Sequence, residues 1–199
     1  MLEVAIVEDN DIIREGFQIL INDSQRYKCS WVYSNCEDFL EDLKKNKPDF
    51  VLMDIELPGM SGIDGLKKLR EESVEILPIV LTVYGENERL FEAIRSGACG
   101  YMLKRSPQEK ILNILDDLSR GESVMSAQIA LKVIDTFGRK PNRKIKKANL
   151  SLSDCEHSIL KYRIEGSSPK AIADSLTLTL SQVYTNFYNI YKKLQQFPI

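Results

Sequence analysis

Short apolar runs alternate with longer amphipathic segments through about residue 120. The runs have the length of buried strands, and the longer segments carry apolar residues at helical spacing. The strand-like runs are Leu2–Val7, Lys28–Tyr33, Val51–Met53, Ile79–Leu81 and Tyr101–Leu103. The helix-like segments are Ile12–Asn22, Cys36–Lys45, Ser61–Ser73, Asn87–Ser96 and Pro107–Arg120. This alternation predicts an α/β domain with a doubly wound, five-stranded parallel sheet.

Capping residues support these boundaries. Asn35, Ser61 and Ser106 stand where helices are expected to begin, and each has a side chain that caps helix N-termini. Gly97 and Gly121 stand where helices are expected to end.

Beyond residue 120 the pattern becomes helical. Ser126–Phe137 carries apolar residues on one helix face. Gly138–Ala148 then combines glycine, proline and a run of basic residues, which is typical of an interdomain linker. Its lysines serve either solubility or contact with phosphates, and the sequence leaves both open.

Three more helices are predicted after residue 150. A capping box at Ser153–Glu156 begins a helix that ends near Gly166. Pro169–Leu176 forms a short second helix, and Ser181 caps a third that runs to about Leu194. Two short helices joined by a small turn predict a helix-turn-helix. The predicted division is an α/β domain at 1–122, a helix and basic linker at 123–149, and a small all-α domain at 150–199.

Polar side chains follow the strands of the predicted sheet. Glu8 and Asp9 follow the first strand, Asp54 ends the third, and Thr82 and Lys104 follow the last two. Chemistry in open parallel sheets collects beyond the carboxyl ends of the strands. Clustered carboxylates bind hard cations such as Mg2+, and with the metal in place Asp54 is suited to attack a phosphoryl group.

At these positions the chain resembles the receiver domain of bacterial two-component response regulators, a flavodoxin-like fold with strand order 2-1-3-4-5. The resemblance implies that Asp54 takes a phosphoryl group from a histidine kinase. It implies that Asp9 and Asp54 bind Mg2+ directly, with Glu8 behind them and the Glu56 carbonyl as a further ligand. Thr82 and Tyr101 would form the switch pair, and Lys104 would bind the phosphate.

Charge is unevenly distributed along the chain. Residues 142–199 carry nine Lys and Arg against four Asp and Glu, a net charge of +5, whereas residues 1–141 carry −7. A basic tail on an acidic body suggests a polyanionic partner for the tail.

The expected compartment is the cytoplasm. The four cysteines are scattered without a CxxC pair, which favours a reducing environment. Acidic residues occur within the first nine positions, whereas a signal peptide begins with basic and apolar residues. No apolar run is long enough to span a membrane.

From Leu152 to Leu194 the chain resembles the helix-turn-helix domain of the LuxR/NarL/FixJ class of regulators. The matching residues are Leu152, Ser153, Glu156, Ile159, Leu160, Gly166, Lys170, Ile172, Ala173, Leu176, Val183, Asn189, Ile190, Lys193 and Leu194. The resemblance implies binding to double-stranded DNA, with Tyr184, Thr185 and Tyr188 at the base-reading positions. Ser181, Lys170, Lys192 and Lys193 complete the candidate DNA contacts.

The function expected from both resemblances is phosphorylation-controlled regulation of transcription. The recognition helix carries Tyr184 and Tyr188 where family members usually carry Lys or Arg, so a tail that binds a protein partner is the alternative. An enzyme is not expected. A haloacid-dehalogenase-like phosphatase needs a second aspartate two residues after its nucleophile, and Glu56 stands there instead.

The helix-turn-helix domains of this class normally continue into a fourth helix that contributes to pairing on DNA. Here five residues that include Pro198 follow Leu194, and proline discourages further helix. If this end is the natural one, the tail lacks a usual dimer surface, and we expect homodimerisation on phosphorylation through the receiver. A fragment of residues 142–199 is expected to be monomeric and to bind DNA weakly.

Overall fold

The computed structural model describes residues 1–72, 76–83, 87–107, 110–138 and 151–196. The chain divides into two compact units, Met1–Leu118 and Ser119–Ile199. The predicted boundary at residue 122 lies four residues after the observed one. None of the described helices is long and apolar enough to cross a membrane.

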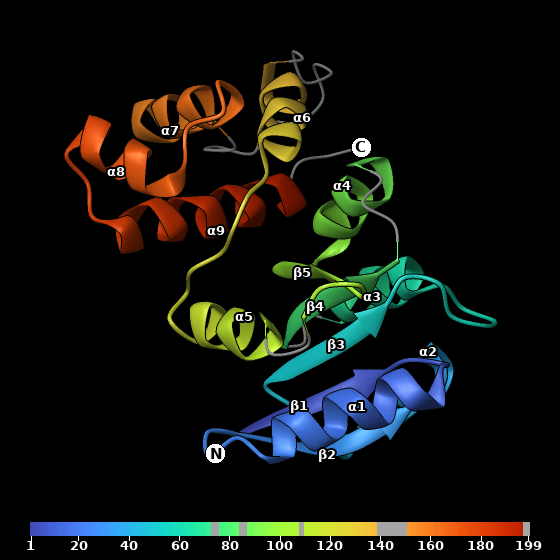
Figure 1. Cartoon of the computed structure of the whole chain (residues 1–199). Helices are drawn as coiled ribbons and strands as arrows, with labels where there is room; N and C mark the ends of the chain where they lie inside the picture. Colours follow the sequence, from blue (N-terminus) through green and yellow to red (C-terminus); the bar gives the residue numbers. More distant parts are fainter. Residues whose placement is uncertain (73–75, 84–86, 108–109, 139–150, 197–199) are drawn as a thin grey trace. The chain divides into compact units, whose positions relative to one another are not determined.

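Unit 1 contains a five-stranded parallel sheet in the order β2-β1-β3-β4-β5 (Figure 1). Its strands are β1 (Leu2–Val7), β2 (Tyr27–Tyr33), β3 (Phe50–Asp54), β4 (Leu77–Thr82) and β5 (Gly100–Leu103). All four pairings are parallel, with Asp54 opposite Leu81 and Thr82 opposite Leu103. The predicted fold class and strand order are confirmed.

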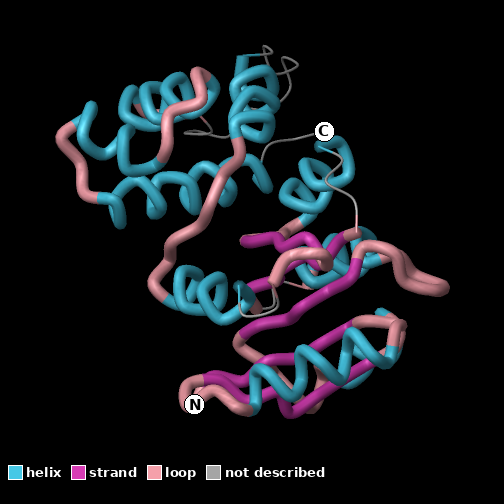
Figure 2. Tube along the Cα trace, viewed as in Figure 1, coloured by secondary structure: helices cyan, strands magenta, loops and turns pink. Residues whose placement is uncertain are grey.

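Within the described residues, four helices connect these strands and a fifth follows β5 (Figure 2). They are α1 (Asp11–Asn22), α2 (Cys36–Asp42), α3 (Gly62–Glu71), α4 (Asn87–Ser96) and α5 (Lys110–Ser119). The core between the sheet and α2, α3 and α4 includes Val7, Met53, Phe39, Leu66 and Ala93, all at most 1 % exposed. Central strands buried in this way have both faces covered, so their sequence is almost continuously apolar.

Local capping explains several helix boundaries. The Asn35 side chain accepts a hydrogen bond from the Asp38 amide, and the Ser61 side chain accepts one from the Asp64 amide. Gly97 and Gly121 have φ values of 138° and 70°, which glycine adopts readily, so they end helices as predicted. The start predicted at Ser106 adjoins residues 108–109, which lie outside the described residues.

Gly62 allows α3 to begin against the end of β3. A Cβ atom at this position would lie 1.9 Å from the carbonyl oxygen of Asp54. Because any side chain would displace that backbone, glycine is required beside the candidate phosphoacceptor.

Unit 2 consists of α6 (Ala127–Gly138), α7 (Asp154–Ile164), α8 (Pro169–Leu176) and α9 (Leu180–Gln196) within the described residues. The helix expected to connect the domains is α6, and it packs against α7. Its apolar face buries Ile129, Ala130 and Val133 completely. The predicted linker Gly138–Ala148 lies outside the described residues except for Gly138.

The predicted cap of the third helix was wrong. The helix begins at Leu180, and Thr179 forms the reciprocal cap: its hydroxyl accepts from the Gln182 amide, and the Gln182 side chain accepts from the Thr179 amide. Ser181 therefore lies inside the first turn, where its hydroxyl is available for a different contact. The capping box predicted at Ser153 and Glu156 is confirmed.

Candidate phosphoacceptor site and recognition helix

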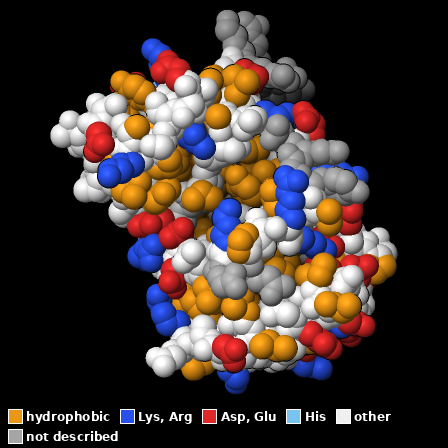
Figure 3. All heavy atoms as spheres, viewed as in Figure 1, with side chains coloured by type: hydrophobic (Ala, Val, Ile, Leu, Met, Phe, Trp, Pro, Cys, Tyr) orange, Lys and Arg blue, Asp and Glu red, His pale blue; other side chains and the backbone are white. Residues whose placement is uncertain are grey.

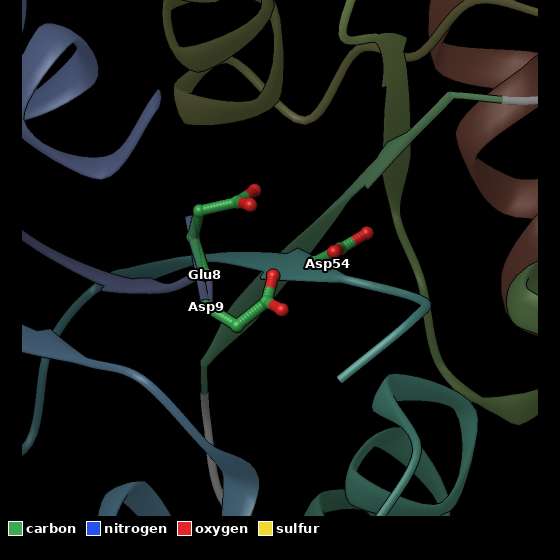
Figure 4. A group of neighbouring side chains, drawn as sticks. All are labelled: Glu8, Asp9 and Asp54. Carbon is green, nitrogen blue, oxygen red and sulfur yellow. The ribbon is translucent and has the colours of Figure 1, made fainter. Parts of the chain in front are cut away.

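The polar residues that follow the strands meet at one edge of the sheet. Figure 4 shows Glu8 and Asp9 after β1 together with Asp54 at the end of β3. Lys104 follows β5, and its amide donates to the Thr82 carbonyl at 2.8 Å. Parallel strands place their carboxyl ends at the same edge, which is why residues almost a hundred positions apart converge here.

Lys104 joins the two buried carboxylates. Its Nζ donates to Asp54 Oδ2 at 2.8 Å and to Glu8 Oε1 at 2.8 Å. Glu8 is fully buried and Asp54 is 2 % exposed. The ammonium group thus compensates two charges whose burial alone would be costly.

Burial controls the protonation of this cluster. Desolvation raises the pKa of Asp54 and of Glu8 above their ordinary values, although the Lys104 ammonium opposes the rise. For Lys104, desolvation favours a lower pKa, but its bonds to both carboxylates outweigh that effect and the pKa is raised. Lys104 therefore stays protonated, as a phosphate-binding residue must be.

The same carboxylates fit a hard cation. Glu8, Asp9 and Asp54 each offer one oxygen, and these oxygens lie within 4.8 Å of one another. Glu8 Oε2 lies 2.7 Å from Lys104 Nζ but receives no well-directed hydrogen bond from the part of the chain that is described. An all-oxygen set with an unsatisfied buried acceptor suits Mg2+ better than a soft metal.

The remaining predicted site residues of unit 1 are Thr82, Tyr101 and Glu56. Thr82 is 3 % exposed at the end of β4, and Tyr101 is half-buried against the core that faces α3 and α4. The Glu56 side chain forms an ion pair with Arg89 of α4 instead of facing the carboxylates. The role predicted for the Glu56 carbonyl stays a prediction.

A pocket of about 640 Å³ opens beside the cluster. Its lining includes Asp9, Glu56, Pro58, Lys67 and Arg89. The pocket therefore reaches the carboxylate cluster at Asp9.

In unit 2 the predicted DNA contacts lie on two helices, α8 and α9. Tyr184, Thr185 and Tyr188 are half-buried on α9, and Lys192 Nζ lies 5.3 Å from the centre of the Tyr188 ring. Lys170 of α8 is exposed. The face of the molecule in Figure 3 mixes Lys and Arg with acidic and hydrophobic side chains.

Two of the residues predicted to contact DNA, Lys193 and Ser181, form hydrogen bonds with other residues of unit 2 instead. Lys193 Nζ donates to Glu156 Oε2 at 2.6 Å and to the Ser151 carbonyl. Ser181 Oγ donates to Glu122 Oε1 at 2.6 Å. Glu122 was missed from the sequence, because an isolated glutamate after a helix-ending glycine gives no signal that it will be buried.

The comparisons with known proteins agree with this geometry. The family model of the response regulator receiver domain matches residues 4–116. The chain is 30 % identical over 193 residues to an uncharacterized transcriptional regulatory protein, YxjL, of Bacillus subtilis, covering 96 % of this chain and 88 % of that protein. It is 31 % identical over 193 residues to the nitrate/nitrite response regulator NarL of Escherichia coli, with the same coverage, 96 % and 88 %.

Among solved structures, the response regulator RcsB in its DNA complex matches 98 % of this chain and 92 % of its own chain. The TM-score is 0.61 and the identity is 20 %, so this match shows the fold. The receiver model covers more than half of the chain, and the transcriptional relatives extend over both units. The chain therefore belongs to the bacterial two-component response regulators of the LuxR/NarL/FixJ class and is a phosphorylation-controlled regulator of transcription.

Proposed function

We propose that Asp54 accepts a phosphoryl group from a histidine kinase and that this reaction controls DNA binding by unit 2. The observation that carries the proposal is the buried cluster in which Lys104 bonds to both Asp54 and Glu8 at 2.8 Å. A buried ammonium beside a carboxylate at a strand end matches the needs of a phosphoryl acceptor.

In the proposed reaction a carboxylate oxygen of Asp54 attacks phosphorus, the bond from phosphorus to the donor imidazole nitrogen breaks, and its electron pair stays on the imidazole. Lys104 then transfers its hydrogen bond from Asp54 to a phosphoryl oxygen. Glu8, Asp9 and Asp54, with the Glu56 carbonyl, would hold Mg2+. The bound cation neutralises negative charge on the transferring group.

Thr82 and Tyr101 are proposed to carry the signal. The new dianion offers acceptors to the Thr82 hydroxyl, and movement of that loop leaves room for the Tyr101 ring to turn inward. Thr82→Ala is expected to leave phosphorylation largely intact and to weaken the phosphorylation-dependent change in assembly or DNA binding. An unchanged response in that variant would remove Thr82 from the mechanism.

For the output step we propose that α9 enters the major groove, with Tyr184, Thr185 and Tyr188 facing the bases. Lys170 and Lys192 would neutralise phosphates, whereas Lys193 must first leave Glu156. Dimerisation through phosphorylated receivers would place two such helices on neighbouring half-sites. A cytoplasmic location completes the proposal, because all four cysteines are free thiols.

The phosphoacceptor assignment is tested by mass spectrometry after incubation with Mg2+ and acetyl phosphate. The wild-type chain should gain one phosphoryl mass, and Asp54→Asn should not. Asp23→Asn, which changes an exposed aspartate at the end of α1, is the matched control and should be labelled like the wild type. Equal labelling of Asp54→Asn would contradict the assignment.

A protein-binding tail is the second candidate function. It is favoured by the aromatic residues of α9 and by the ion pair that engages Lys193. A gel shift at increasing salt separates the two functions, because DNA binding through phosphates weakens steeply with ionic strength.

A further inference from the structure

The loop at residues 55–61 connects β3 to α3 and begins directly after Asp54 (Figure 1). This loop reaches the phosphoacceptor through Glu56. Burial raises the pKa of Asp54, and hydrogen bonds from the Lys104 ammonium and the Glu56 amide oppose the rise. The Glu56 carbonyl is also the further Mg2+ ligand of the proposed function. The position of the loop therefore matters both for the reacting carboxylate and for the cation.

Main-chain hydrogen bonds fix the two ends of the loop. The Ile55 amide donates to the Leu81 carbonyl of β4 at 3.2 Å, and the Gly62 amide donates to the Ile55 carbonyl at 3.0 Å. Between these ends, residues 56–61 have neither helical nor strand structure. Fixing the backbone of such a segment costs conformational entropy, so the middle of the loop needs contacts of its own to stay in one position.

The first turn of α2 supplies these contacts. Glu37 Oε1 accepts from the Met60 amide at 2.9 Å, and the Cys36 thiol donates weakly to the Ser61 carbonyl at 3.7 Å. Cys36 is completely buried, and the Asn35 side chain caps the helix. The helix turn that carries Glu37 is thus held in unit 1, although the Glu37 side chain itself is exposed.

Gly59 leaves room for the Glu37 carboxylate beside the loop. The φ of Gly59 is 75°, and a Cβ atom at this position would lie 2.6 Å from Glu37 Oε1. Any other residue would be strained here and would push the carboxylate away from the Met60 amide. The glycine and the glutamate together fit the loop against α2.

We propose that Glu37 is a positioning residue for the cation site, because its bond to the Met60 amide holds the Glu56 carbonyl where Mg2+ binds. The inference rests on the proposed function, which assigns Mg2+ to the carboxylate cluster and this carbonyl. Glu37 lies outside that cluster and acts only through the loop, as residues behind metal ligands commonly do. Without its bond, the affinity for the cation falls with the fraction of molecules whose loop is in place. One hydrogen bond changes that fraction about 3- to 10-fold.

The test measures binding of Mg2+ alone to the unphosphorylated full chain by calorimetry. Glu37→Ala should raise the dissociation constant about 3- to 10-fold. Glu37→Gln loses the charge but keeps an acceptor oxygen for the Met60 amide, so it should stay within about twofold of wild type. Glu41→Ala removes a carboxylate from an exposed position one turn further along α2 and should also stay within about twofold.

Two further readouts separate positioning from a general loss of stability. The Met60 amide should exchange its hydrogen faster in Glu37→Ala than in wild type or Glu37→Gln. At saturating Mg2+, acetyl phosphate should phosphorylate Glu37→Ala at the wild-type rate within about twofold, because saturation selects the molecules whose loop is in place. A variant that only destabilised the fold would not change the Mg2+ dissociation constant while keeping the saturated rate.

Two results would overturn the positioning role of Glu37. The first is an unchanged dissociation constant in Glu37→Ala. The second is an equal loss in Glu37→Ala and Glu37→Gln, which would identify the charge of Glu37, and not its hydrogen bond, as the cause. Both results leave the proposed function intact while the wild type binds Mg2+ and is phosphorylated at Asp54. Absence of Mg2+ binding by the wild type would instead overturn the proposed cation site and this inference together.

Discussion

Replacing Lys104 by methionine tests how the buried acidic cluster is held in the fold. Methionine keeps most of the apolar stem but removes the ammonium that bonds to Asp54 and Glu8. The Lys104 side chain is 9 % exposed and those of Asp54 and Glu8 are 3 % and 0 %, so water replaces little of the lost interaction. Breaking a buried ion pair typically costs about 3 to 5 kcal/mol. We expect a loss near the lower figure, because the carboxyl groups can take up protons.

That proton uptake makes the loss depend on pH. Burial already raises the pKa of Asp54 and Glu8, and removal of Lys104 takes away the effect that opposes the rise. A carboxyl with a raised pKa binds its proton more tightly in the folded than in the unfolded chain. Its contribution to stability therefore increases as the pH falls through the window between the ordinary and the raised pKa, and is lost as the pH rises.

Urea unfolding near pH 8 and near pH 5, with and without Mg2+, measures this effect. The free-energy gap between wild type and Lys104→Met should be largest at the higher pH, and both acid and Mg2+ should reduce it. Lys44→Met, at an exposed position after α2, is the control and should stay within about 0.5 kcal/mol of wild type. A gap that is the same at both pH values and insensitive to Mg2+ would refute the reasoning.

Three further outcomes are expected. Ile129→Ala opens a cavity between α6 and α7 and should lower the free energy of unfolding of unit 2 by about 2 to 5 kcal/mol. Hydrogen exchange of the α7 amides measures this loss, and unchanged exchange would show that α6 does not stabilise α7. Thr177→Gly relieves a left-handed residue with φ of 55° and should stabilise the same unit by about 1 kcal/mol, measured in the same way; destabilisation would contradict this. Burial raises the pKa of Cys36 to about 12. A thiol reagent at about pH 8 should therefore label only the exposed Cys155 in the native chain. Rapid labelling of Cys36 would contradict its burial.

The α/β fold of unit 1 could be predicted from the sequence because its signals are local. Each strand is a short apolar run, and Asp54 and Lys104 directly follow or end such runs, so parallel pairing is enough to bring them to one edge. The capping side chains of Asn35 and Ser61 act within three residues of themselves, which is also a local signal. Strands, strand-end residues and helix caps depend on residues that are close in sequence, so the sequence alone predicts them.

The arrangement of unit 2 depended on contacts between distant residues. Glu122 and Ser181 are 59 positions apart, and no periodicity links them. Lys193 counts as an available cation in the sequence, but the fold places it 2.6 Å from the carboxylate of Glu156. The apolar face of α6 predicts a helix but not the surface it covers, since apolar contacts have no directional preference. Tertiary packing decided that α6 packs on α7, that Glu122 is buried, and that Ser181 and Lys193 of α9 already have partners. Only the folded chain determines which surfaces come together and exclude water.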